Sequence, residues 1–274
     1  MMALTNLTNL TAIHFSGGDA GSFLHSQLSA DVLGLAGGQS VFACYCEPRG
    51  RVMALLLVYR HEQDYYTIMS RALAASIVKR LKIYVLRSNV IIDALDECCV
   101  AGLHTDDEWQ PAPASLPAIP VPDSDDRMVI TTGIPATATD TRLKDAWKIS
   151  ELQRGISWMC PETSGQFLPQ MLGFDTLGAV NFRKGCYPGQ EIVARTHYLG
   201  KVKRHPRLVC TTAMVCPDPL DKIEISCGDE QYDAVIADCG HSEDGGSCLF
   251  TVTRMDPALT VDAMEYLGQV CPVV

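Results

Sequence analysis

Residues 182–195, FRKGCYPGQEIVAR, surround a single cysteine with groups that could make it reactive. Gly185 and Gly189 allow positive φ angles and close backbone approach, and Pro188 stiffens the stretch, so we expect a tight exposed loop. The thiolate of a cysteine is its nucleophilic, oxidisable and metal-binding form. The sequence leaves three roles open for Cys186: covalent chemistry, metal ligation, or the filling of a small space in a structural turn.

Charged residues flank this cysteine on both sides. Arg183, Lys184 and Arg195 could lower the pKa of the thiol by favouring the thiolate. Glu191 could bind a cation or accept hydrogen bonds from a bound heterocycle. The loop itself contains no histidine that could serve as a base, and His197 is the nearest in sequence.

Positive charge is concentrated in this part of an acidic chain. The protein has 274 residues and a net charge of −10, which argues against a general nucleic-acid coat. Residues 183–207 nevertheless hold seven lysines and arginines and one acidic residue, Glu191. This window favours a local anionic ligand or, with equal weight, a solvated strand or loop face.

The twelve cysteines do not follow common metal or redox patterns. There is no Cys-x-x-Cys and no His-Glu-x-x-His, so the usual zinc and thioredoxin motifs are absent. The first lysine or arginine is Arg49, and the longest apolar run, near MALLLVY, is too short for a membrane span. We therefore expect a cytoplasmic protein without membrane contact. In that reducing compartment we expect most cysteines to pack as free thiols, including Cys210, Cys216, Cys227, Cys239, Cys248 and Cys271.

The elements that would position the loop belong to an α+β protein. Residues 10–17, 40–46, 51–60, 64–70, 88–95 and 98–103 are expected to form strands, and 71–86 an amphipathic helix. Asp19 is expected to cap a short helix. The proline-rich residues 104–126 predict an irregular crossing, followed by a strand at 127–133. Residues 139–156 are the strongest helix, and short strands after residue 200 predict a small β-barrel or sandwich.

One motif narrows these readings. KGCYPGQE resembles the signature of the YgfZ family of folate-binding proteins, in which the position of Pro188 is variable. GGDAGSFLHSQLSADV and CYCEPRGRVMA resemble the N-terminal blocks of that family, and YLGKVKRHPRLV continues the likeness toward the C-terminus. The resemblance runs nearly end to end and is weakest between residues 95 and 140.

The family resembles the glycine-cleavage T protein in fold, which implies three domains around a tetrahydrofolate channel. A discontinuous central α+β domain would comprise residues 1–45 and 135–200. A ferredoxin-like domain would comprise residues 46–134, and a C-terminal β-barrel residues 201–274. The resemblance implies tetrahydrofolate or another reduced folate as the cofactor.

The resemblance also transfers roles to particular residues. Cys186 would be the reactive thiol, with no metal ligand assigned. Trp147 falls where a family tryptophan contacts folate, and its indole is suited to stacking on a flat ring. A second such tryptophan would fall near Leu10, which departs from the pattern. The other folate-binding positions would be Lys184, Gly185, Tyr187, Gly189, Gln190, Glu191 and Arg195.

The implied function is that of a folate-binding accessory protein. It would serve the assembly or repair of iron–sulphur client proteins and so support tRNA modification indirectly, without stable nucleic-acid binding. The alternatives are a tetrahydrofolate-dependent aminomethyltransferase and a cysteine enzyme acting through Cys186. Against the transferase, Ala54 and Leu55 lie where the T protein carries aspartates, and Gln153 lies where it carries a glutamate that grips the pterin.

Overall fold

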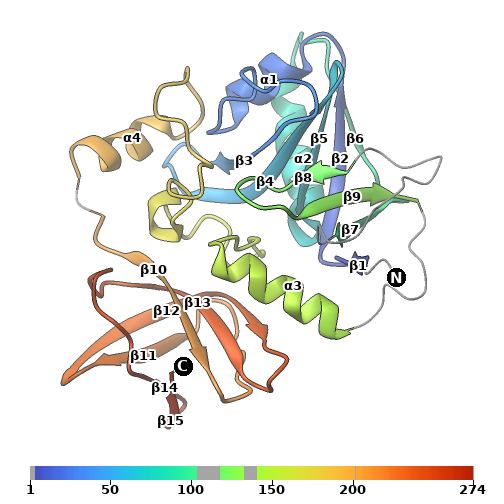
Figure 1. The fold of residues 1–274 in the computed structure, drawn as a ribbon. Helices are drawn as coiled ribbons and strands as arrows, with labels where there is room; N and C mark the ends of the chain where they lie inside the picture. The colour runs from blue at the N-terminus through green and yellow to red at the C-terminus, as the bar shows by residue number, and fades with distance from the viewer. Residues whose placement is uncertain (1–3, 104–117, 133–140, 201, 274) are drawn as a thin grey trace.

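The computed structural model describes residues 4–103, 118–132, 141–200 and 202–273 of the protein (Figure 1). These residues form three antiparallel sheets, with the strand orders β3-β4-β5-β2-β6, β1-β7-β9-β8 and β10-β13-β12-β11-β14-β15. The α-helices among them are α1 (Ala20–Gln27), α2 (Arg71–Val85), α3 (Thr141–Gln153) and α4 (Gln190–Tyr198). The α+β class that the sequence predicted is confirmed.

The five-stranded sheet carries most of the main core. Its strands are β2 (Leu10–Ser16), β3 (Ser40–Cys46), β4 (Val52–His61), β5 (Asp64–Ser70) and β6 (Ile91–Ala94). β4 lies between β3 and β5 and is buried at nearly every position, which accounts for its continuous apolar sequence. α2 buries Leu73, Ile77 and Leu81, and Val85, the fourth residue of the four-apart spacing that predicted its inner face, is part-buried.

The four-stranded sheet is smaller and lies on the side of α3. It comprises β1 (Thr5–Asn6), β7 (Cys99–Leu103), β8 (Ile119–Pro120) and β9 (Arg127–Thr131). A Cβ on Gly102 of β7 would lie 2.6 Å from the ring of Trp147, so only glycine lets the α3 indole approach the strand this closely.

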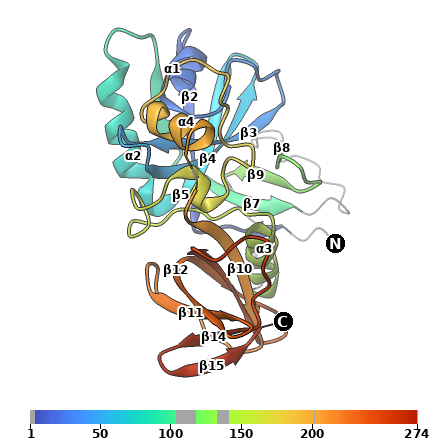
Figure 2. The same ribbon diagram turned by 90° about the vertical axis from the view of Figure 1, so that its left-hand side faces the viewer.

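The C-terminal sheet is a barrel that packs against the opposite side of α3 (Figures 1 and 2). Its strands are β10 (His205–Thr211), β11 (Lys222–Cys227), β12 (Glu230–His241), β13 (Ser247–Thr253), β14 (Ala263–Tyr266) and β15 (Gln269–Pro272). A bridge between Thr211 and Val273 joins its two edges. A Cβ on Gly240 of β12 would lie 2.8 Å from Lys148 Cγ, so a glycine again permits close contact with α3.

Three details differ from the sequence prediction. α4 was not predicted, because its short sequence has few apolar residues and follows a glycine-rich loop. Asp19 makes no side-chain cap hydrogen bond to α1; its Oδ2 instead accepts one from Asn89 N at 2.8 Å. Packing as thiols is wrong for four barrel cysteines, which form the disulfides Cys210–Cys248 and Cys216–Cys239. Such bonds are not what a reducing compartment favours.

The domain division stays a prediction. β2 and β3 belong to the same sheet as β4, β5 and β6, so the boundary expected after residue 45 falls inside one sheet. The part of the expected irregular crossing at residues 104–117 lies outside the described residues.

Candidate functional site

The signature loop, residues 182–189, packs against the turn between β3 and β4. Gly189 and Gly50 make the closest contact, which is called the clamp below. Gly189 has a φ of +82°, and a Cβ there would lie 2.4 Å from Glu47 O. Gly50 in that turn has a φ of +77°, and a Cβ on it would meet Ile192 at 3.0 Å and Gly189 O at 3.2 Å. Both positions need glycine twice over, for the left-handed backbone and for the close approach. α4 begins directly after this clamp.

A buried serine connects β3 to residues 179–181, the segment that leads into the signature loop. Ser29 Oγ donates to Ala179 O at 2.5 Å and accepts from Cys44 N at 2.8 Å. The Ser29 backbone makes two further hydrogen bonds. Its N–H donates to Cys44 O at 3.0 Å, and its carbonyl accepts from Asn181 N at 2.9 Å. Asn181 Oδ1 then accepts from the backbone N–H groups of Arg183 and Lys184, at 2.8 and 3.1 Å.

Lys184 turns away from the thiol that it was expected to activate. Its ammonium donates to His25 O and, at 2.6 Å, to Leu28 O, which are carbonyls at the C-terminal end of α1. A cation is favoured there, because the last carbonyls of a helix lack intrahelical partners. Burial lowers the pKa of Lys184 to about 8, and nearby Asp31 and Cys186 act in the opposite direction.

Cys186 is the exposed one among the free cysteines that the structure describes. Next to it, Gly185 has open space, since the nearest atom to a Cβ there would be His25 Nε2 at 4.0 Å. His25 Nδ1 lies 3.3 Å from Asp31 Oδ1, which leaves Nε2 on the side of the loop. Burial, then Lys184, lower the pKa of His25, while Asp31 raises it. α1 therefore places one histidine beside the loop at Gly185.

The remaining motif residues divide into structural and exposed positions. Tyr187 is buried, its ring centroid lies 5.1 Å from Lys184 Nζ, and burial raises the pKa of its hydroxyl. Gln190 Nε2 donates to Lys184 O at 3.3 Å, closing the loop on itself. Glu191 in the first turn of α4 and Arg195 in its last turn are exposed.

The basic window does not act as one surface. Lys184 binds α1 carbonyls, and Arg207 donates to the carbonyls of Asp256 and Leu259 in the barrel. Arg183 and Arg195 remain exposed on the loop and α4.

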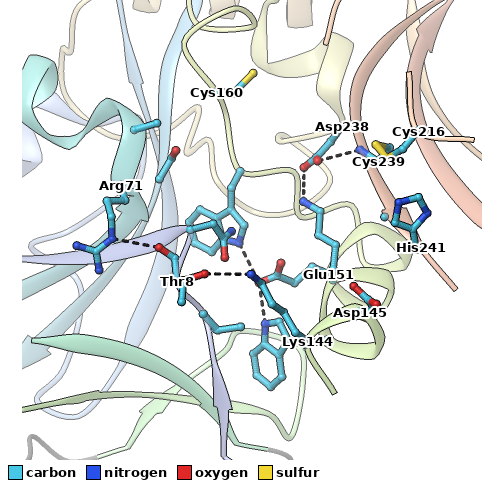
Figure 3. A pocket seen from close by; sticks show the side chains of 18 of the residues that line it. Thr8, Arg71, Lys144, Asp145, Glu151, Cys160, Cys216, Asp238, Cys239 and His241 are labelled. Carbon is cyan, nitrogen blue, oxygen red and sulfur yellow. Dashed lines mark hydrogen bonds and ion pairs between the residues drawn. A yellow bond between two sulfur atoms is a disulfide. The ribbon is translucent and has the colours of Figure 1, made fainter. Parts of the chain in front are cut away.

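A separate pocket of about 640 Å³ opens between α3, the N-terminal strands and the barrel (Figure 3). It lies in the part of the molecule where α3 meets β12, whereas the loop lies beside α1 and α4, away from the barrel (Figures 1 and 2). Its described lining includes Trp147 but no residue between Arg183 and Arg195. The lining residues used below are Arg71, Lys144, Trp147, Lys148, Glu151, Trp158 and Asp238.

The floor of this pocket is built from two indoles and one carboxyl group. Trp147 and Trp158 are 1% and 5% exposed, and Glu151 is 2% exposed. Both indole N–H groups donate to the same oxygen, Glu151 Oε1, at 2.9 and 2.8 Å. Burial raises the pKa of Glu151, although Lys148 and the two indole hydrogen bonds lower it.

Cations stand around the mouth of the pocket. Arg71 and Lys144 are exposed, and they are anchored by hydrogen bonds to Leu10 O at 2.8 Å and to Thr8 Oγ1 at 3.0 Å. Lys148 is neutralised by Asp238, whose Oδ2 lies 2.6 Å from its ammonium. The pocket thus combines an aromatic, largely apolar floor with two cations at its rim.

The site residues therefore fall into two places. The structure places Lys184 at the end of α1 and Gly189 against the β3–β4 turn, and of the predicted site residues it places only Trp147 in the pocket. Gln153, aligned with the pterin-gripping glutamate of the T protein, is exposed and lines a different cavity with Gly155 and Leu172. Sequence reasoning missed Glu151, Trp158 and His25. The one available signal was the spacing of Trp147 and Glu151, which puts both on one helix face.

The whole fold is similar to that of the aminomethyltransferase T class of the glycine cleavage system. The structure matches the crystal structure of glycine cleavage system aminomethyltransferase T from Bartonella henselae with a TM-score of 0.71 at 13% identity. The match covers 99% of this chain and 84% of the other, so the expected fold is confirmed.

Sequence comparison gives the family. The chain is 30% identical over 256 residues to the tRNA-modifying protein YgfZ of Klebsiella pneumoniae, covering 83% of this chain and 77% of that protein. It is 26% identical over 272 residues to the protein of the same name from Colwellia psychrerythraea, covering 90% and 83%. The chain belongs to the YgfZ family. No family model matches it.

Among the described residues, no group of three or more His, Cys, Asp or Glu side chains is placed to hold a metal ion. Within the same residues, no helix is long and apolar enough to cross a membrane.

Proposed function

We propose that this protein binds tetrahydrofolate, or another reduced folate, in the pocket between α3 and the barrel. The observation that carries the proposal is the pairing of a two-indole floor with a cationic rim in one cavity. A pterin and aminobenzoyl group are flat and aromatic, and the glutamate tail is anionic. The ligand would therefore enter with its ring system first and leave its carboxylates near Arg71 and Lys144.

The residues present fit such a ligand. The cavity, about 640 Å³, lies within the range of about 300–1,000 Å³ that is usual for small-molecule sites. Trp147 and Trp158 supply apolar contact, and Glu151 supplies a polar group deep inside. The alternative, aminomethyl transfer, would need a proton-transferring group. Ala54 and Leu55 are buried on β4 and cannot provide one.

Fluorescence of the pocket tryptophans tests the folate proposal directly. In a Trp109→Phe background, only Trp147 and Trp158 would report, and titration with tetrahydrofolate should give saturable quenching. Arg71→Gln with Lys144→Gln should weaken binding of the folate but not of a pterin lacking the glutamate tail. Absence of quenching at millimolar tetrahydrofolate would contradict folate binding in this pocket.

We propose, second, that the protein acts in the cytoplasm as an accessory factor for iron–sulphur proteins and so supports tRNA modification, with Cys186 as its reactive thiol. The tRNA-modifying name of its relatives supports the wider role. Exposure of Cys186, next to a glycine with open space and near His25, supports the thiol role.

Timed alkylation of the native protein with mass mapping tests the thiol role, and Cys186 should label fastest. Cys160, a part-buried thiol in the pocket lining, is the internal comparison. Cys186→Ser should then fail to restore the modified tRNA nucleoside in a strain lacking its own family member. Full rescue by this variant, with slow labelling of Cys186, would contradict the role.

A further inference from the structure

Glu151 uses only one of its two oxygens within the protein. Oε1 accepts from Trp147 Nε1 and Trp158 Nε1, which fills its acceptor positions. Oε2 has no hydrogen-bond partner among the described residues, although the side chain is 2% exposed. Oε2 is also not one of the fully buried polar atoms that lack a partner. Its exposed surface therefore faces the pocket that Glu151 lines.

The two indoles do not need a carboxyl group. An amide oxygen would accept the same two N–H bonds without bringing charge into a buried position. Burial raises the pKa of Glu151, which shows that the charged form is disfavoured here despite Lys148 and the two indoles. Asp238, a part-buried acid of the pocket wall, is engaged by Lys148 at 2.6 Å and by Cys239 N at 2.9 Å.

A free carboxylate oxygen at the floor of an aromatic pocket matches an N–H donor edge on a flat ligand. The pyrimidine ring of a pterin carries such an edge, formed by the ring N3–H and the 2-amino group. Charge-assisted hydrogen bonds of this kind are roughly twice as strong as neutral ones. Few other groups at the floor could receive these donors, because Trp147 and Trp158 are donors themselves.

We propose that Glu151 is the specificity-determining residue of the pocket, accepting through Oε2 the N–H donors of a 2-amino-4-oxopyrimidine ring. The inference rests on the proposed folate function and adds the residue that reads the pterin head. It assigns this part to Glu151 in place of Gln153, which lies outside the pocket.

The geometry offers a variant that changes one atom facing the ligand. In E151Q the amide oxygen must stay on the two indole N–H groups, because the reverse orientation would set donor against donor. The amide NH₂ then replaces Oε2 and faces the donor edge of the ligand. The fold keeps both internal hydrogen bonds, whereas the recognition pattern at the floor is inverted.

The test is a binding comparison with three probes: 5-formyltetrahydrofolate, its analogue carrying a 2-methyl in place of the 2-amino group, and p-aminobenzoylglutamate. E151Q should bind 5-formyltetrahydrofolate at least tenfold more weakly than the parent chain. p-Aminobenzoylglutamate should change less than threefold, and the 2-methyl analogue, which keeps only the N3–H donor, should lose less affinity than 5-formyltetrahydrofolate does. E224Q, an exposed carboxyl-to-amide change on β11, controls for net charge, and near-ultraviolet circular dichroism checks that the tryptophans stay packed.

The outcomes separate the two proposals. If the parent chain binds 5-formyltetrahydrofolate and E151Q binds it equally well, the role of Glu151 is overturned while the folate function stands. An equal loss for all three probes also overturns it, since that pattern shows damage to the pocket rather than lost recognition of the donor edge. If the parent chain binds none of the folates, the proposed function fails and the inference fails with it.

Discussion

The signature loop and the pocket under α3 are built in opposite ways. The loop is held by backbone groups: Gly189 against Glu47 O, the Ser29 links, and a lysine on helix carbonyls. The pocket floor is held by hydrogen bonds between side chains of α3 and the segment that follows it, from Trp147 and Trp158 to Glu151, and β12 lies against it. A compact motif therefore marks the loop in the sequence, while nothing comparable marks the pocket.

This difference decides which substitutions each region tolerates. In the loop, damage should follow from any added Cβ at the clamp and little from changes at its open edge. In the pocket, damage should follow from lost side-chain volume, and exchange of polar groups should alter recognition more than stability. Each expectation can be measured separately.

The largest effect is expected in the pocket floor. Trp147→Ala should lower the free energy of unfolding by about 4 kcal/mol, because it removes a fully buried aromatic side chain and leaves a cavity. Trp147→Phe keeps much of the packing on Gly102 and should cost about half as much. Urea unfolding followed by circular dichroism measures both, and a loss below 1 kcal/mol for Trp147→Ala would show that the indole is not packed as described.

The next effect separates two glycines of one motif. Gly189→Ala should cost about 3 kcal/mol, since its φ of +82° and the 2.4 Å approach to Glu47 O both exclude a Cβ. Gly185→Ala should stay within about 0.5 kcal/mol, because the site is open. The same urea experiment compares them, and equal costs would contradict the clamp.

A smaller effect is expected from the charge of Glu151. A carboxyl whose pKa is raised by folding costs nothing below its unfolded pKa and destabilises progressively as pH rises through the folded pKa. E151Q should therefore differ least from the parent chain near pH 4, and its stability relative to the parent chain should increase as pH rises to 7. Urea midpoints across this range test the sign, with E224Q as control. A difference that does not change with pH would remove the titration of Glu151 as its cause.

The smallest effect concerns Lys184. Its folded pKa of about 8 lies below the usual lysine value, so the unfolded chain binds more protons above pH 8, and stability contributed by this group rises with pH. After allowance for partial solvent exposure, the rise should be about 1 kcal/mol between pH 8 and 10 relative to Lys184→Met. Lys82→Met, an exposed change on α2, is the matched control. Parallel profiles for the parent chain and Lys184→Met would contradict the shifted pKa.

Much of the fold could be predicted from local patterns. The apolar run of β4 and the four-residue spacing of Leu73, Ile77 and Leu81 each reflect burial along one element. α4 could not be predicted this way, since its only buried residue is Val193. The helix is fixed instead by the clamp before it and by Gln170, whose amide donates to Val193 O at 2.8 Å.

The candidate site was predictable where it is local and unpredictable where it is not. Cys186 was expected to be exposed between glycines, and it is. Lys184 was expected to act on the thiol, but the carbonyl end of α1 competes for its ammonium. The spacing of Glu151 from Trp147 was a weak signal, because the value of Glu151 as a site residue also depends on Trp158 and on the barrel wall.

Ser29 also bears on the order in which the molecule is made. Its hydroxyl joins β3 to Ala179, residues far apart along the chain. Closing so long a loop costs entropy that local contacts do not repay, so such contacts form late in folding.

During synthesis the five-stranded sheet can form as soon as β6 has left the ribosome, well before residues 179–198 exist. Until those residues are made, the hydroxyl of Ser29 beside β3 lacks its acceptor, the carbonyl oxygen of Ala179. In a refolding time course we expect the signature loop to become protected from proteolysis last among the segments packed around the five-stranded sheet.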